Sequence, residues 1–151
     1  MNGSLGFLLD TSVVLHATRA NSPVPGMIDA QFGLSTSRFR PAVCEVTVAE
    51  LLAFSFSYRW GDRRKVLLKA QIEKTLIIPI AHPGVHQRWA EISSALRSAG
   101  LTVGQNDIWI AATASIAGMT LLTTDKDFLA VQGVAVLDVR VLDSKTGLVQ
   151  S

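Results

Sequence analysis

Four acidic residues stand where a strand or helix is expected to begin or end. They are Asp10, Glu50, Asp107 and Asp125. Asp10 directly follows the apolar residues 7–9, and a short apolar run of this kind is typical of a strand buried on both faces. Because an ionised carboxylate is costly inside such a strand, we expect Asp10 at its carboxyl end, where α/β proteins bind ligands.

Three of these acids also have a purely structural explanation. Glu50 could complete a capping box that begins at Thr47. Asp107 could be a first-turn acid favoured by the helix dipole, and Asp125 could cap the helical turn that follows it. Asp10 is the hardest to explain in this way, because no helix starts within the apolar run before it.

The acids make chemical sense as a group. If the strand that ends at residue 124 pairs with the strand that ends at residue 9, Asp10 and Asp125 follow neighbouring strands, about 4.8 Å apart. Carboxylates that close repel each other and raise each other's pKa unless a cation lies between them. Mg²⁺ prefers oxygen ligands of this kind, whereas the lack of a well-placed His or Cys in the sequence argues against zinc.

The elements that must position the acids alternate along the chain. We expect strands at residues 7–9, 41–46, 76–80, 119–124 and 134–139, and helices at residues 12–18, 47–59, 63–74, 83–99 and 107–117, with a short helical turn at 125–130. Asn106 is expected to cap the helix at 107–117, and residues 27–40 are ambiguous between helix and loop. Strands that alternate with helices favour a parallel sheet covered on both faces.

Length and composition predict one domain over residues 1–151, with a core at about 6–139 and a polar tail. The hydrophobic fraction of 48% and charged fraction of 17% exclude a disordered chain. A net charge of +2 does not by itself indicate a nucleic-acid binder. The single cysteine, Cys44, excludes an internal disulfide and fits a reducing compartment. Without a signal peptide or an apolar run of membrane-spanning length, we expect a cytoplasmic protein.

Four motifs, in this order, resemble those of the PIN domain family, and specifically the VapC-type ribonuclease toxins of VapBC toxin–antitoxin modules. The matching segments are Leu-Leu-Asp10-Thr-Ser-Val, Thr47-Val-Ala-Glu50-Leu, Asn106-Asp107-Ile-Trp-Ile-Ala-Ala-Thr-Ala and Leu-Leu-Thr-Thr-Asp125-Lys-Asp127-Phe. The resemblance spans about residues 6–139, which is nearly the whole chain. Each motif is unspecific alone, whereas the four together in this order and spacing are specific.

The resemblance implies a three-layer α/β/α sandwich around a five-stranded parallel sheet, and a Mg²⁺- or Mn²⁺-dependent endoribonuclease. It implies that the acidic cluster consists of Asp10, Glu50, Asp107 and Asp125, with Asp127 as the alternative last member, and that Ser12 and Asn106 support it. Glu50 would bind the metal or orient the attacking water. The implied products are a 5′-phosphate and a 3′-hydroxyl. The implied partners are an RNA substrate, a VapB-like antitoxin and a second copy of the chain in a homodimer.

The densest group of basic residues has two interpretations. Arg59, Arg63, Arg64 and Lys65 form either a solvated helix face or a surface that contacts RNA phosphates. Arg38 and Arg40 are weaker candidates for RNA contact. Trp60 lies beside the group, and we expect it to be the most exposed tryptophan.

Two other functions compete with the nuclease. A phosphatase of the haloacid dehalogenase type would use Asp10 as a nucleophile, but it requires a second Asp two residues later, where this chain has Ser12. A catalytically degenerate PIN domain would only bind RNA or protein. The presence of all four acids argues against this second alternative.

Overall fold

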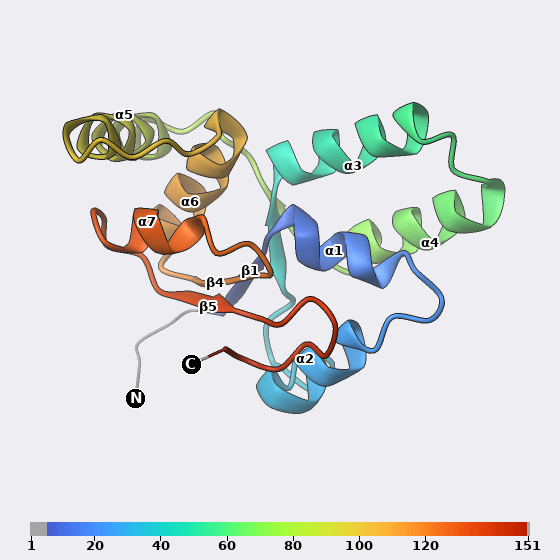
Figure 1. Ribbon diagram of the computed structural model, residues 1–151. Helices are drawn as coiled ribbons and strands as arrows, with labels where there is room; N and C mark the ends of the chain where they lie inside the picture. The colour runs from blue at the N-terminus through green and yellow to red at the C-terminus, as the bar shows by residue number, and fades with distance from the viewer. Residues whose placement is uncertain (1–5, 151) are drawn as a thin grey trace.

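The centre of the fold is a parallel sheet. The computed structural model describes residues 6–150, and the sheet has five strands in the order β3-β2-β1-β4-β5 (Figure 1). The strands are β1 (Phe7–Leu9), β2 (Ala42–Cys44), β3 (Leu76–Ile78), β4 (Thr120–Thr123) and β5 (Val139–Val141). The predicted five-stranded parallel sheet is therefore confirmed.

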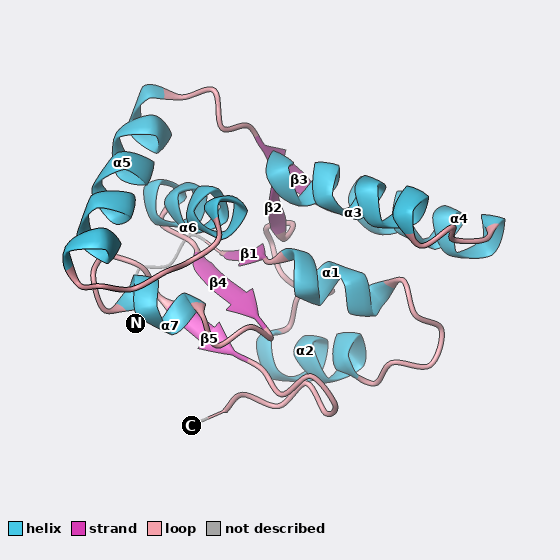
Figure 2. Ribbon diagram, turned by 45° about the horizontal axis from the view of Figure 1, so that its top comes forward, coloured by secondary structure: helices cyan, strands magenta, loops and turns pink. Residues whose placement is uncertain are grey.

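Helices cover both faces of the sheet (Figure 2). On one face lie α1 (Thr11–Ala17), α2 (Val24–Phe32), α3 (Glu45–Ser57) and α4 (Asp62–Glu73). On the other lie α5 (Pro83–Ser98), α6 (Gln105–Ala117) and α7 (Phe128–Gln132). This arrangement is the α/β/α sandwich that the resemblance implies. In the part of the chain that the structure describes, no helix is both long enough and apolar enough to cross a membrane.

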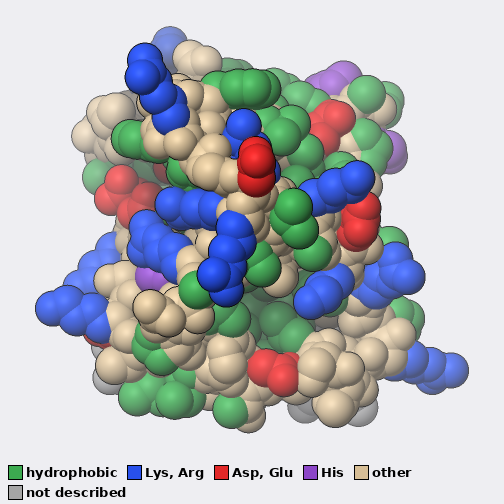
Figure 3. Space-filling view, turned by 90° about the vertical axis from the view of Figure 1, so that its right-hand side faces the viewer, with side chains coloured by type: hydrophobic (Ala, Val, Ile, Leu, Met, Phe, Trp, Pro, Cys, Tyr) green, Lys and Arg blue, Asp and Glu red, His purple; other side chains and the backbone are tan. Residues whose placement is uncertain are grey.

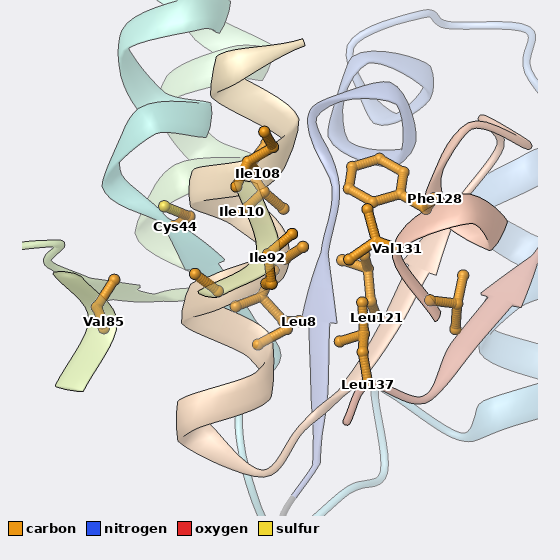
Figure 4. Close-up of a cluster of buried hydrophobic side chains, with 14 of the residues drawn as sticks. Leu8, Cys44, Val85, Ile92, Ile108, Ile110, Leu121, Phe128, Val131 and Leu137 are labelled. Carbon is orange, nitrogen blue, oxygen red and sulfur yellow. The ribbon is translucent and has the colours of Figure 1, made fainter. Parts of the chain in front are cut away.

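Alternating side chains of the strands divide the core into two layers. Leu8 and Leu121 pack with the α5, α6 and α7 side, and their neighbours Leu9 and Leu122 pack with the α1 to α4 side. This is the period-two alternation of a strand buried on both faces. Figure 4 shows the first layer, with Phe128 of α7 against the sheet. Cys44 lies in the same layer and is fully buried.

Three predicted boundaries are wrong, each for a local reason. The fifth strand is Val139–Val141 rather than 134–139, because the N–H groups of Val134 and Ala135 bond to the carbonyl of Val131 and continue the turn after α7. Helix α3 begins at Glu45, directly after β2, so Thr47 lies inside the first turn and caps nothing. Helix α6 begins at Gln105 with Gly104 as its N-cap, so Asn106 is not the cap either.

The ambiguous stretch and the predicted tail pack against each other. Helix α2 starts at Val24, with a proline in its first turn, and ends at Gly33, where φ is +65° and glycine is favoured. Gln31 on this helix donates to the carbonyl of Gly147 and accepts from the N–H of Val149. The described residues after β5 are therefore bound to α2, and the core extends to Leu142, beyond its predicted end at 139.

The packing of Phe128 generates a stability prediction. Its side chain is fully buried, so Phe128→Ala removes apolar contacts and leaves a cavity. We expect a loss of about 3–5 kcal/mol in the free energy of unfolding, measured by urea denaturation. Val136→Ala, at a residue that is 82% exposed, is the control and should change it by less than about 0.5 kcal/mol. A loss below about 1 kcal/mol for Phe128→Ala would contradict this packing.

Candidate active site

The order of the strands along the chain reverses at β1, between β1 and β4, and the acids lie near this point. Strand β1 pairs with β2 on one side and with β4 on the other, with Leu9 opposite Leu122. The predicted pairing of these two strands is confirmed. The N–H of Asp10 extends the ladder by donating to the carbonyl of Leu122 at 2.9 Å. Because β1 and β4 are parallel neighbours, the residues that follow them share one edge, which is the ligand-binding edge of doubly wound sheets.

Asp10 is held by hydroxyl groups. Its side chain is 4% exposed, and its Oδ2 atom accepts hydrogen bonds from Ser12 Oγ and Thr123 Oγ1, each at 2.8 Å. Burial raises the pKa of Asp10, and the two hydroxyl hydrogen bonds oppose this effect because they stabilise the carboxylate. Ser12 also accepts from the N–H of Thr124 at 3.1 Å, so it connects α1 to the end of β4.

Glu50 is fixed by residues from two other helices. Thr11 Oγ1 lies 2.7 Å from Glu50 Oε1, and Asn106 Nδ2 donates to Glu50 Oε2 at 3.3 Å. Thr11 Oγ1 is also 3.0 Å from the hydroxyl of the fully buried Thr47. A hydroxyl has one proton to donate, and because Glu50 as a carboxylate can only accept, Thr47 donates to Thr11 and Thr11 donates to Glu50.

The pKa of Asp107 is raised by burial and by the charges of the other acids. Asp107 lies in the first turn of α6 and is half-buried. Burial is the main cause that raises its pKa to about 7, followed by the negative charges of Asp10, Asp125, Glu50 and Asp127. The structure therefore places the other four predicted acids near enough to Asp107 for their charges to act on it.

Asp125 and Asp127 occupy different environments. Asp125 is half-buried, and its N–H bonds to Thr123 Oγ1 at 2.9 Å, the hydroxyl that also donates to Asp10. Asp127 is exposed, and its N–H donates to Asp125 Oδ1 at 2.9 Å. Asp125 is thus bound into the same network as Asp10, which favours Asp125 over Asp127 as the last member of the cluster.

The five acids have no basic partner in the described part of the chain. The ion pairs within residues 6–150 join Arg88 to Glu91 and Arg140 to Asp138, away from the cluster. Over the same residues, no three His, Cys, Asp or Glu side chains converge into a ready-made metal-binding group. The charges of the other acids act on Asp107, but the carboxylates are not close enough to form a metal-binding group in the described part of the structure. Carboxylate oxygens without a cationic neighbour are the donor set that suits Mg²⁺ or Mn²⁺.

Sequence reasoning missed three of the residues that shape the site. Thr11, Thr47 and Thr123 are buried hydroxyl residues that bond to the acids or to each other. Each stands within three residues of a predicted acid, and a buried threonine beside a carboxylate was the available signal. Thr47 was interpreted as a helix cap instead.

The predicted basic cluster is divided in the structure. Arg59, Arg63 and Lys65 are exposed, whereas the Arg64 guanidinium lies 3.7 Å over the ring of Trp60. The expectation of an exposed Trp60 is wrong, because Trp60 is 8% exposed and packs in the α1 to α4 layer under that guanidinium.

Comparison with known proteins agrees with this geometry. The PIN domain family model matches residues 7–134, so the chain belongs to the PIN domain family. Two relatives are from Mycobacterium tuberculosis. Ribonuclease VapC5 is 27% identical over 133 residues, which cover 80% of this chain and 97% of that protein. Ribonuclease VapC4 is 46% identical over 55 residues, but these cover only 36% of this chain and 42% of that protein.

Solved structures show the same fold. VapBC2 from Rickettsia felis, bound to a promoter DNA fragment, aligns with a TM-score of 0.78 and 19% identity over 92% of this chain and all of the matched chain. VapBC-5 from Mycobacterium tuberculosis, a member of the VapBC family of toxin–antitoxin systems, aligns with a TM-score of 0.66 and 26% identity over 91% of this chain and 98% of the other.

The burial of Asp107 beside other acids predicts how stability depends on pH. Its pKa is about 7 in the folded protein against an ordinary 3.8, so between these values the folded state holds a proton that the unfolded state has lost. Stability therefore falls as the pH rises from about 4 to about 7, and the whole penalty is present above pH 7. After allowance for solvent screening, Asp107→Asn should add about 1–3 kcal/mol to the free energy of unfolding at pH 8 without divalent metal.

The measurement is urea denaturation at pH 5 and pH 8 in EDTA. The gain from Asp107→Asn should be smaller at pH 5, where Asp107 is already protonated in the folded state. Glu73→Gln is the control, since Glu73 is an exposed acid outside the cluster. Equal stability of Asp107→Asn and the wild type at pH 8 would contradict the cost of ionising Asp107 in the folded protein.

Proposed function

We propose that this protein is a Mg²⁺- or Mn²⁺-dependent endoribonuclease and the toxin component of a type II toxin–antitoxin module. The observation that carries the proposal is that Asp10 and Asp125 follow the paired strands β1 and β4, near enough to Asp107 for their charges, with those of Glu50 and Asp127, to raise its pKa. These acids have no ion-pair partner among the described residues. Membership of the PIN domain family, and relatives that are named ribonucleases, support the same activity.

The residues divide into ligands and groups that position them. Asp10, Asp107 and Asp125 would hold the metal ion, with Asp127 as the alternative to Asp125 at the edge of the site. When bound, the ion supplies positive charge that lowers the pKa of a water and stabilises the charge that develops on the phosphoryl oxygens. Ser12 and Thr123 fix the Asp10 carboxylate in one orientation through their hydrogen bonds to Oδ2.

Glu50 is the group placed to accept a proton. Its two oxygens are oriented by Thr11 and Asn106, so it can take a proton from the water that attacks the phosphorus. A new P–O bond forms from that water, the bond from phosphorus to the 3′ oxygen breaks, and the 3′ oxygen takes up a proton. The products are a 5′-phosphate and a 3′-hydroxyl.

We further propose a VapB-like antitoxin as the protein partner, with a homodimeric toxin in the cytoplasm. The support for the antitoxin is that VapBC-5, a related structure, is a member of a toxin–antitoxin family. A cavity of about 490 Å³ between α1, α2 and the end of α4 offers a surface for it. Leu9, Val13 and Ile28 give this cavity an apolar floor, and Arg38 and Arg40 lie on its lining, a composition that suits an amphipathic segment with acidic residues.

Removal of a proposed ligand should abolish cleavage without unfolding the protein. We expect Asp10→Asn and Asp107→Asn each to lower the rate of Mg²⁺-dependent RNA cleavage by more than about 100-fold, while the far-UV circular dichroism stays unchanged. In the same samples, Mg²⁺ or Mn²⁺ should raise the melting temperature of the wild type more than that of either variant. Glu73→Gln is the control for both readouts. Cleavage by either Asn variant at the wild-type rate would refute the shared-metal site.

Expression in cells tests the toxin assignment. Wild type should arrest growth and Asp107→Asn should not, and mapping of RNA 5′ ends should show one dominant cut site with the wild type only. Growth arrest by both the wild type and Asp107→Asn would refute an RNA-cleaving toxin. RNA binding without cleavage in vitro would instead support the degenerate PIN domain.

The hydrogen bond from Thr11 predicts a separate effect. Thr11→Val keeps the volume but removes the donor to Glu50, so we expect kcat to fall about 10-fold or more with little change in KM. Thr11→Ser retains the hydroxyl and should retain most of the activity. Equal kcat values for the Val and Ser variants would show that this hydroxyl does not position Glu50.

A further inference from the structure

A second pocket lies where the ends of α1 and α3 meet the start of α4. It has a volume of about 380 Å³ and is lined by Leu15, Arg19, Phe54, Tyr58, Trp60 and Arg64. None of these residues belongs to the acidic site. Its lining combines aromatic rings with two guanidinium groups and includes no carboxylate.

Helical spacing connects the pocket to the acids. Glu50 and Phe54 on α3, and Tyr58 at its C-cap, stand four residues apart, and the N–H of Tyr58 still bonds to the carbonyl of Phe54, so they lie on one side of the helix. Thr11 and Leu15 have the same spacing on α1, and the hydrogen bond from Thr11 to Glu50 places the two faces against each other. The pocket therefore lies on the same side of α3 as Glu50. Tyr58 is about 12 Å from Glu50 along the helix axis, which is the rise of eight helical residues.

Arg64 is fixed in the pocket. Its guanidinium stacks on Trp60 at 3.7 Å, and its Nε donates to Thr18 Oγ1 at 3.2 Å. The Thr18 hydroxyl in turn donates to the carbonyl of Leu15 at 2.7 Å. Only one of the five N–H groups of the guanidinium is used in this arrangement, so the others are available to an anion.

The charges around Arg64 are unbalanced. Within residues 6–150, neither Arg19 nor Arg64 takes part in an ion pair. Burial lowers the pKa of Arg64, and the positive charge of Arg19 adds to the effect, so the two cations are near enough to repel each other. Figure 3 shows the face on which α1 and α3 end and α4 begins, where Lys and Arg side chains dominate the middle of the surface. An anion between Arg19 and Arg64 would relieve this repulsion.

Tyr58 supplies the aromatic part of the site. It is 72% exposed, although its ring centroid lies 5.9 Å from that of Phe54. An exposed aromatic ring beside two arginines is the combination that binds single-stranded nucleic acid, because the ring stacks on a base while the cations bind the phosphate. Pairing in a duplex would make that base unavailable for stacking.

We propose that this pocket is a nucleotide-binding subsite for single-stranded RNA, in which Tyr58 stacks on a base and Arg19 and Arg64 bind the adjoining phosphate. The subsite rests on the proposed ribonuclease function and adds a second contact about 12 Å from Glu50 along the helix axis. It holds one unpaired nucleotide at a set distance from the scissile phosphate, and so restricts which RNA sites are cut. Because it does not touch the reacting atoms, it acts on KM.

The test is the affinity for a fluorescein-labelled oligouridylate, measured by fluorescence anisotropy in EDTA so that the RNA stays intact. We expect Tyr58→Ala and Arg19→Ala each to raise Kd by about 10-fold, in line with the loss of one stacked base or one phosphate contact. Both residues are exposed, so both variants should fold. Tyr58→Phe keeps the ring and should bind within about twofold of the wild type.

Lys69→Ala is the matched control. Lys69 is an exposed cation on α4, the same helix as Arg64, and does not line the pocket. Lys69→Ala removes one positive charge, as Arg19→Ala does, but it should change the Kd for the oligouridylate by less than about twofold. Equal losses for Arg19→Ala and Lys69→Ala, or wild-type affinity of both Tyr58→Ala and Arg19→Ala, would overturn the subsite. So would equally tight binding of a duplex of the same length, since a paired base cannot stack on Tyr58.

Cleavage assays with Mg²⁺ separate this proposal from the proposed function. If the wild type cleaves RNA and the pocket variants match it in KM and kcat, the subsite is wrong and the ribonuclease stands. If the wild type binds the oligouridylate through Tyr58 and Arg19 but cleaves no RNA, the subsite stands and the ribonuclease is wrong. A wild type that neither binds nor cleaves RNA would refute both.

Discussion

The burial of an acid beside other carboxylates at the ends of β1 and β4 is the constraint on which the site depends. The parallel pairing of these strands places Asp10 and Asp125 at one edge, and α3 and α6 add Glu50 and Asp107. The pKa of Asp107, raised to about 7, shows that this arrangement opposes ionisation. A fold selected for stability alone would not gather these charges, and the proposed cation would offset the cost of holding them.

Neutral hydrogen-bond donors hold these acids in place. Thr123 and Ser12 donate to Asp10, while Thr11 and Asn106 donate to Glu50. Hydroxyl and amide groups orient a carboxylate without cancelling its charge, whereas a lysine or arginine would neutralise the acids and compete with a metal ion. The network therefore preserves the negative potential while it removes conformational freedom.

The charges of the molecule are separated along α1. The helix begins at the acids, where Thr11 contacts Glu50, and ends near Arg19 and Arg64, whose positive charges are unpaired in the described chain. A polyanion would be repelled by the metal-free acids and attracted by the basic end. One short helix thus connects a site suited to a cation with a pocket suited to a phosphate.

The sequence by itself determined the elements and the identity of the acids. Buried strands have continuous apolar runs, so residues 7–9 and the acid after them were recognisable locally, and the alternation of strands and helices gave the parallel sheet. Boundaries followed less directly from the sequence: α3 begins at Glu45, directly after β2, where a capping-box pattern predicts a start at Thr47. Only the tertiary structure decided the roles of Thr47 and Trp60. Local sequence predicts a cap at Thr47 and an exposed ring at Trp60, but the environment of each comes from another element: Thr11 of α1 bonds Thr47, and Arg64 of α4 covers Trp60. The local sequence pattern indicates secondary-structure propensity and the periodicity of buried residues. Hydrogen-bond partners and ring stacking depend instead on contacts between residues far apart in the chain.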